Sequence, residues 1–181
     1  VWINEIYVIL YKKTKYRGVK MSIEKVKEYF AEYGREDDIL EFDQSSATVE
    51  LAAEAAHVIP ARIAKTLSFK NKEGDNAILI VVAGDAKIDN KKYKKEFSTK
   101  AKMLTPEEVM QYIGHAIGGV CPFAIANKDV KVFLDVSMKR FNTVFPACGS
   151  SNSAIELTCD EMEKYSHCEK WVDVCKAYDE T

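Results

Sequence analysis

A glycine-rich segment, Gly114–Phe123, is the first place in the sequence where the residue types could do chemistry. It reads Gly-His-Ala-Ile-Gly-Gly-Val-Cys-Pro-Phe. Gly118 and Gly119 lack a side chain, so a ligand can approach their main chain closely. Pro122 has a fixed φ and biases Cys121 toward an extended conformation. Such a segment can offer N–H and C=O groups to a substrate; the alternative is a tight turn between a helix and a strand.

The second candidate is Lys65, which lies within the segment Ile63–Phe69. This segment alternates as a half-buried strand does, and a period of two places Lys65 on the same face as Leu67 and the two terminal residues. Burying an ammonium without a partner is costly because the charge loses its hydration. The pattern therefore predicts a cation directed into a cleft, toward an anionic or carbonyl group. The alternative is a side chain whose ammonium reaches water at the edge of the sheet.

The other reactive side chains form no recognised hydrolase motif. There is no Gly-x-Ser-x-Gly elbow, and none of His57, His115 and His167 lies in a nucleophile–base motif. Cys121 would be a nucleophile only if a base such as His115 lowered the pKa of its thiol; the alternative is that it lines the site. The cysteine and histidine spacings near the C-terminus match no common zinc pattern. We expect no metal site.

Strands and short helices must position these residues. Apolar alternation and continuous apolar runs predict strands over residues 39–42, 63–69, 77–83, 130–135, 143–147 and 153–157. Capping residues and apolar stripes predict helices that begin at Ser22, Thr48, Thr105 and Thr158. A further apolar stripe from Cys168 to Cys175 has helical spacing. The interspersed patterns predict an α+β (mixed α/β) fold.

The composition is that of a soluble globular domain. The 181 residues, 47% hydrophobic and 30% charged, suffice for one core, and no apolar run approaches the roughly 20 residues that span a bilayer. A net charge of −2 argues against a protein that coats nucleic acids. Five cysteines without a Cys-x-x-Cys motif are typical of reduced thiols. We expect a cytoplasmic protein without a membrane or DNA partner.

The composition changes at Met21. Residues 1–20 combine an apolar run with a basic stretch after it, the reverse of the order in a signal peptide. Ser22 can cap the first convincing helix. We interpret residues 1–20 as an N-terminal extension that need not be native, and residues 21–181 as a single domain.

Three stretches together resemble the YbaK/ProX family of aminoacyl-tRNA deacylases, which is related to the editing insertion domain of bacterial prolyl-tRNA synthetases. They are Ala61–Leu67, Gly118–Pro122 and Gly149–Leu157. The lysine of Lys-Thr-Leu and the G-x-x-x-P loop are the most specific parts, and the likeness runs from about Ile23 to Met162. It implies a curved, mostly antiparallel sheet flanked by helices, and a trans-editing hydrolase that needs neither a metal nor another cofactor.

The resemblance also implies roles for residues of the site. Lys65 would orient the 3′ end of the substrate, and Gly118 and Gly119 would hold the aminoacyl ester, while a ribose hydroxyl of the substrate assists the attack by water. The further substrate-binding residues that it implies are His115, Val120, Cys121, Pro122, Gly149, Ser150 and Ser151. Many relatives carry Gly-x-Arg-Gly where this chain has Gly149-Ser150-Ser151-Asn152. Because that arginine is absent, its contacts are not expected and the amino-acid specificity stays open.

A lysine-rich stretch is the expected surface for tRNA. It contains Lys91, Lys92, Lys94 and Lys95, and no other segment after Met21 concentrates lysine so heavily. A chain of net negative charge needs a local positive field to approach a polyanion. The alternative is an ordinary solvated surface.

The expected partner is the acceptor end of a mischarged tRNA, with tRNA for proline carrying a small non-cognate amino acid as the substrate. Prolyl-tRNA synthetase is a second partner that the resemblance suggests. Two other functions remain open: a module of the same fold that binds aminoacyl-tRNA or a small ligand without turnover, and a partner domain of a synthetase.

Overall fold

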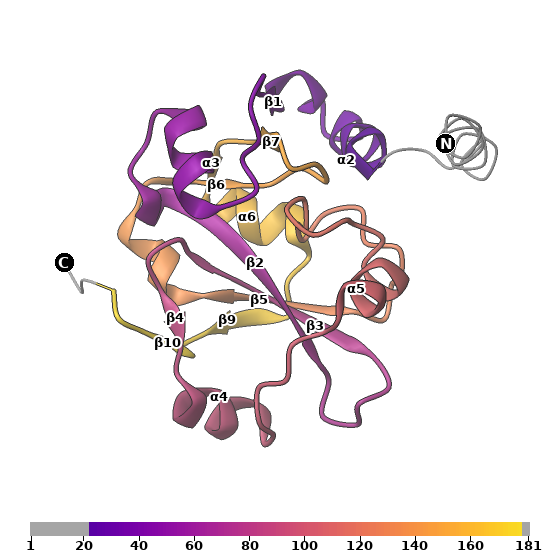
Figure 1. Ribbon diagram of the computed structural model, residues 1–181, viewed down its shortest axis with the longest axis vertical. Helices are drawn as coiled ribbons and strands as arrows, with labels where there is room; N and C mark the ends of the chain where they lie inside the picture. Colours follow the sequence, from indigo (N-terminus) through magenta and orange to yellow (C-terminus); the bar gives the residue numbers. More distant parts are fainter. Residues whose placement is uncertain (1–21, 179–181) are drawn as a thin grey trace, which may run out of the picture.

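A computed structural model describes residues 22–178 of the chain (Figure 1). The extension predicted over residues 1–20 lies outside the described residues, so its boundary at Met21 stays a prediction.

A twisted six-stranded sheet forms the centre of the fold, with the strand order β8-β6-β2-β3-β5-β9. The two long strands β2 and β3 form an antiparallel pair, and they cross the middle of Figure 1. Parallel pairing joins β2 to β6, β3 to β5 and β5 to β9, whereas β6 and β8 are antiparallel. The bounds are β2 Ile63–Lys70, β3 Ala77–Ala83, β5 Lys131–Asp135, β6 Thr143–Pro146, β8 Leu157–Thr158 and β9 Lys170–Val172.

Two small antiparallel pairs form separate two-stranded sheets. β1 (Leu40–Glu41) pairs with β7 (Ser153–Ala154), and β4 (Lys87–Ile88) pairs with β10 (Cys175–Lys176). The first pair ties the segment that follows the N-terminal helix to the loop after β6. The second closes the described C-terminal end onto the connection that follows β3.

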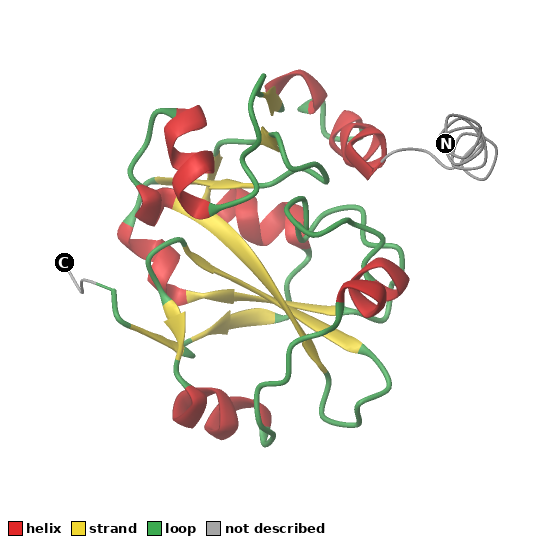
Figure 2. Cartoon of the chain, viewed as in Figure 1, coloured by secondary structure: helices red, strands yellow, loops and turns green. Residues whose placement is uncertain are grey.

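Helices surround the sheet on several sides and do not form a single layer (Figure 2). Among residues 22–178 the α-helices are α2 Ser22–Ala31, α3 Val49–Ala56, α4 Asn90–Phe97, α5 Pro106–Tyr112 and α6 Cys159–Ser166. Short 3₁₀ turns are η1 Glu36–Asp38, η2 Pro60–Arg62 and η3 Val136–Arg140. Complete capping boxes at Thr105 and Thr158 begin α5 and α6, as the sequence predicts.

The core is built on β3, whose seven residues are all buried. This strand lies between β2 and β5, so helices or loops must cover both of its faces, and a continuous apolar sequence satisfies that requirement. Phe30 of α2, Tyr93 of α4 and Met162 of α6 are fully buried in the same cluster.

The mixed α/β class predicted from the sequence is confirmed. Over the three described sheets, four of the seven strand pairings are antiparallel, while the six-stranded sheet itself is mixed, with three parallel pairs. The expected helix over Cys168–Cys175 is wrong, because Lys170–Val172 is strand β9 and Cys175 begins β10. Helix α4 lies in the lysine-rich stretch, where the sequence reading assigned no element.

Candidate active site

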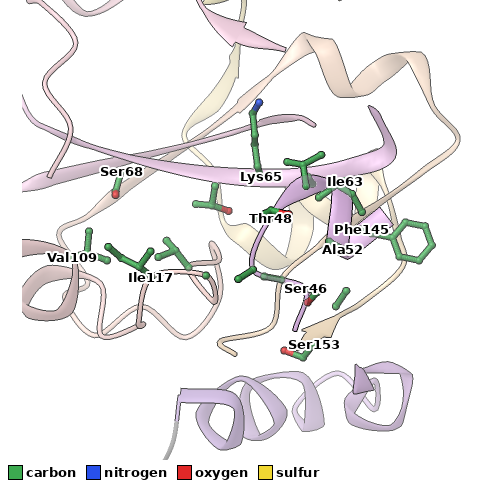
Figure 3. Close-up of a pocket in the computed structure, with 18 of the residues that line it drawn as sticks. Ser46, Thr48, Ala52, Ile63, Lys65, Ser68, Val109, Ile117, Phe145 and Ser153 are labelled. Carbon is green, nitrogen blue, oxygen red and sulfur yellow. The ribbon is translucent and has the colours of Figure 1, made fainter. Parts of the chain in front are cut away.

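A small pocket opens between the start of α3, strand β2, helix α5 and the glycine-rich segment (Figure 3). Its volume is about 230 Å³, below the roughly 300 Å³ at which pockets for drug-sized ligands begin. Aliphatic and aromatic side chains make most of its wall, with hydroxyl groups set among them. The hydroxyl-bearing residues are Ser46, Thr48, Thr66, Ser68 and Ser153.

The pocket lies at a gap in the pairing of strand β2. Pairing with β6 ends at Ala64, opposite Pro146, and the bridge to Met103 begins at Phe69. Between these points, β2 has a strand partner only on the β3 side within the described part of the chain. Part of the β2 edge therefore faces the pocket in place of another strand.

Thr66 lies in the middle of this gap. The Ser68 C=O accepts from Leu104 N–H at 3.1 Å, and Lys70 N–H donates to Lys102 C=O at 2.8 Å, both across the edge away from β3. Strand geometry repeats every two residues, so the main-chain N–H and C=O of Thr66 point to the same edge. The Thr66 Oγ1 is buried and has no hydrogen-bond partner among residues 22–178. A buried hydroxyl without a partner is costly, and this one belongs to a residue that lines the pocket.

Lys65 occupies the other face of β2. Figure 3 shows its side chain leaving the strand on the opposite side from Ser68. The Nζ donates to the Gly84 C=O at 2.8 Å, and burial lowers the pKa of this lysine. Lys65 contributes to the pocket lining, while its ammonium is held by the main chain at Gly84. Of the described residues that line the pocket, Lys65 alone carries a titratable side chain.

The middle of the glycine-rich segment forms one wall of the pocket. Gly118 and Val120 line it, together with Ile117. Gly118 has a φ of +91°, and a Cβ there would lie 3.1 Å from the Cβ of Ala47. The Gly118 conformation and the close packing both require glycine, as the sequence predicts for a tight loop.

Gly119 has a different role from the one expected. A Cβ at this position would lie 2.6 Å from the main-chain nitrogen of Ser150. The close approach for which Gly119 is needed is therefore made by the protein's own loop, and Gly119 is not among the lining residues. It packs the glycine-rich segment against the Gly149–Ser151 loop.

The end of the segment, residues 121–123, is buried behind the wall. Cys121 and Pro122 are both buried, and neither lines the pocket. Burial raises the pKa of the Cys121 thiol to about 12, because the thiolate would lose its hydration. A thiol that stays protonated at neutral pH is a poor nucleophile, so the geometry disfavours a catalytic Cys121.

His115 is fully buried and holds the segment in place. Its Nε2 donates to the Phe123 C=O at 2.8 Å, and its Nδ1 contacts the Ser22 hydroxyl at the start of α2. Burial lowers the pKa of this imidazole, which favours the neutral form that can donate from one nitrogen and accept at the other. His115 does not line the pocket. Its contacts are those of a residue that positions the loop.

The Gly149–Ser151 loop supports the pocket from outside. Gly149 has a φ of +84°, and a Cβ there would lie 2.8 Å from the main chain of Ser22. Ser150 Oγ donates to Ser153 Oγ at 2.7 Å, and Ser151 C=O accepts from Ser46 N–H at 2.5 Å. Ser153 and Ser46 line the pocket, so the predicted loop positions its neighbours.

The lysine-rich stretch lies apart from the pocket. Lys91, Lys92, Lys94 and Lys95 are on α4, at the opposite end of the view in Figure 1 from α3. Lys92 already donates to Asp173 at 2.7 Å and to the Cys175 C=O at 3.0 Å. Any contact with a polyanion would fall mainly to the other three.

The sequence reading missed several lining residues, chiefly Thr66 and Ser68. A signal was present, because these residues alternate with Lys65 and so had to face the other side of the same strand. Ser46, Ser153 and Phe145 come from distant segments that only the sheet pairing brings together. Within residues 22–178, no group of three or more His, Cys, Asp or Glu residues is arranged to hold a metal ion.

The fold and pocket define a class of compact mixed α/β domain with a small, mostly apolar site at the edge of a central strand. The chain belongs to the aminoacyl-tRNA editing domain family, which matches residues 43–165, more than half of its length. This match covers β2, the glycine-rich segment and every residue that lines the pocket.

Two relatives match this chain over very different shares of their own length. YwhH of Bacillus subtilis (strain 168), an uncharacterized protein, is 58% identical over 159 residues, which are 88% of this chain and 100% of YwhH. The proline–tRNA ligase of Thermotoga maritima is 27% identical over 139 residues, which are 76% of this chain but 23% of the ligase. The chain therefore corresponds to a segment of the ligase and to the full length of YwhH.

Solved structures share the fold. The crystal structure of a proposed trans-editing enzyme for prolyl tRNA synthetase matches with a TM-score of 0.77 and 26% identity, covering 88% of this chain and 99% of the other. The hypothetical protein APE2540 matches with a TM-score of 0.73 at 23% identity, over 84% of this chain and 99% of the other. The predicted family and fold are confirmed. No helix among residues 22–178 is both long and apolar enough to cross a membrane.

Proposed function

We propose that the protein is a trans-editing hydrolase, which removes a small non-cognate amino acid from mischarged tRNA, with tRNA for proline as its substrate. The family supplies the reaction class, and the likeness to segments of proline–tRNA ligases supports the choice of tRNA. The pocket supports a small amino acid, because its volume of about 230 Å³ leaves room for little beyond the aminoacyl group.

The observation that carries the mechanism is the chemistry of the pocket lining. It offers hydroxyls and main-chain groups, and Lys65 is its only titratable side chain among the described residues. No carboxylate, imidazole or thiol of the lining can act as a general base. An aminoacyl ester is already activated, so positioning and stabilisation of the developing negative charge can accelerate its hydrolysis.

In the proposed reaction, water attacks the ester carbonyl carbon while a hydroxyl of the substrate's terminal ribose assists by accepting a hydrogen bond from it. The carbon–oxygen bond to the ribose then breaks, and the ribose oxygen takes a proton from the attacking water. The products are the free amino acid and a tRNA with an intact terminus. Thr66 N–H, at the open edge of β2, is a main-chain donor that can stabilise the oxyanion. The step needs no metal ion.

Lys65 supports the site from behind. Its ammonium holds the Gly84 C=O, and this contact fixes the position of β2 relative to the turn that follows β3. A direct contact with the 3′ end of the substrate would require the Nζ to leave that carbonyl. In either role, Lys65→Ala should lose turnover even on a minimal aminoacyl-nucleoside ester.

A second candidate function is a binding module that holds aminoacyl-tRNA without turnover. The lack of a carboxylate, imidazole or thiol in the described lining favours it, as does the hydrogen bond that holds the Lys65 ammonium at the Gly84 C=O. The two functions differ only in the fate of the ester bond, so one assay separates them.

The test is deacylation of tRNA for proline charged with alanine, serine or cysteine, measured with and without a chelator. The proposal predicts release of at least one amino acid at a rate that the chelator leaves unchanged. Stable esters across the whole panel, together with measurable binding, would establish the binding module. Loss of turnover on chelation would overturn the metal-free step.

A further inference from the structure

Two large apolar side chains stand exposed at the pocket. Met103 is 59% exposed and Ile117 is 64% exposed, and both line the pocket. The other four large exposed apolar side chains among residues 22–178 do not line it: Leu40, Leu51, Ile59 and Met110. Single exposed apolar residues are ordinary on a protein surface, but these two border the same pocket.

The main chain of each residue is constrained by its own segment. Met103 forms a bridge with Phe69 at the end of β2, and Ile117 precedes the constrained glycine Gly118. Their main chains are therefore fixed at the margin of the pocket, while their side chains reach into solvent. Methionine is flexible and polarizable, and its sulfur makes favourable contacts with aromatic rings.

We propose that Met103 and Ile117 hold the terminal nucleobase of the substrate outside the pocket. The inference rests on the proposed function, because it identifies what lies next to the aminoacyl group. A pocket of about 230 Å³ cannot take the amino acid and a nucleoside together, so the nucleoside must lie at the opening. A nucleobase has apolar faces and polar edges, which suits two apolar side chains with water at the rim.

Charge at the same place fits this occupant. Lys102 directly precedes Met103 in the chain and is exposed, so a cation lies within one residue of the apolar pair, where it also interacts with the carboxylate of Glu108. A nucleotide end presents both an apolar base and an anionic phosphate, and an apolar peptide would gain nothing from that cation. The two side chains and the neighbouring cation therefore fit the end of a nucleic acid strand better than they fit an apolar peptide.

The test compares two esters of one amino acid, one on adenosine and one on a ribose that lacks the base. Met103→Ser and Ile117→Ser should each lower kcat/KM about five- to tenfold more on the adenosine ester than on the base-free ester, through KM, because both residues also line the pocket for the aminoacyl group. Met110→Ser is the matched control, because Met110 is 52% exposed on α5 but does not line the pocket. Met110→Ser should leave kcat/KM unchanged on both esters.

A binding measurement separates this inference from the proposed function. An amide analogue that cannot be hydrolysed, made with and without the base, is titrated against the wild type and the variants. Tighter binding of the analogue with the base, abolished in Met103→Ser and Ile117→Ser, supports the inference even if no ester is hydrolysed. Equal binding of the two analogues, or equal losses on both esters, would overturn it while leaving hydrolysis intact.

Discussion

The surface of the pocket and the layer directly behind it are built from different chemistry. The surface carries aliphatic groups and hydroxyls, and the layer behind carries the titratable side chains His115 and Cys121 with the ammonium of Lys65. Each of these three groups donates a hydrogen bond to a main-chain carbonyl of the protein, at Phe123 or Gly84. The comparison teaches that reactive groups near a pocket can serve its rigidity; in the proposed reaction, the chemistry is left to the substrate and to main-chain donors.

The largest effect on stability should come from the supporting layer at Gly119. Gly119→Ala would place a Cβ 2.6 Å from the main chain of Ser150, where no flexible side chain can move aside. We expect a loss of about 1–3 kcal/mol in the free energy of unfolding, measured by chemical denaturation. Gly34→Ala is the control, since that position has open space and only a φ of +64°, and it should cost about 1 kcal/mol or less. Equal losses in the two variants would contradict the close packing.

A second effect should appear in the pH dependence of stability. Burial lowers the pKa of His115 below its ordinary value, so the unfolded chain binds a proton more readily than the folded one. Stability should therefore fall as the pH drops below about 6.5 and be unaffected by this group above that pH. His115→Gln should flatten this slope, because the substituted side chain does not titrate. An unchanged slope in His115→Gln would show that His115 is not buried as a neutral group.

A third substitution, Thr66→Val, affects the pocket surface and leaves the layer behind it unchanged. Thr66→Val removes a buried hydroxyl without a described partner, so stability should stay within about 0.5 kcal/mol of the wild type or rise. Deacylation should nevertheless slow, by about tenfold, if the hydroxyl contacts the substrate. Ser137→Ala is the matched control, because the Ser137 Oγ accepts from Ala83 N–H at 3.1 Å. That variant should lose about 1 kcal/mol and keep its activity; a Thr66→Val protein that is destabilised as much would contradict this assignment.

The smallest effect concerns the surface of α4, far from both regions. Replacing Lys91, Lys94 and Lys95 by glutamine should weaken tRNA binding and flatten its salt dependence by about 0.7–0.9 of a log–log unit for each phosphate that is no longer neutralised. Lys92→Gln alone should do less, because Lys92 is paired with Asp173. Hydrolysis of a minimal ester should not change in any of these variants. Wild-type affinity and salt slope in the triple variant would show that tRNA binds elsewhere.

Much of the fold could be predicted from local sequence. Thr105 and Thr158 carry complete capping signals, and the apolar run of β3 needs burial on both faces, so neither depends on distant residues. The helix predicted over Cys168–Cys175 was wrong because a helical spacing of apolar residues occurs there by chance across two short strands. Pairing with β5 and β4 decides the conformation of that stretch, and such pairing is not visible in local periodicity.

The site was predictable in part. The lysine strand and the glycine-rich segment do meet at one pocket, through Lys65, Gly118 and Val120. The division of that segment into a wall and a buried anchor was not predictable, because it depends on the distant partners Ser22 and Ser150. The hydroxyl of Thr66 gains its importance only from the gap in strand pairing, which is a property of the whole sheet.

The central claim is that the pocket positions an ester whose hydrolysis is assisted by the substrate itself. The most direct measurement is single-turnover deacylation of the best substrate of the amino-acid panel, compared with the same tRNA whose terminal ribose lacks the hydroxyl next to the ester. We predict that the wild-type protein binds both and hydrolyses only the first at a substantial rate. Equal rates on the two substrates would contradict the claim, because a group of the protein would then have to activate the water.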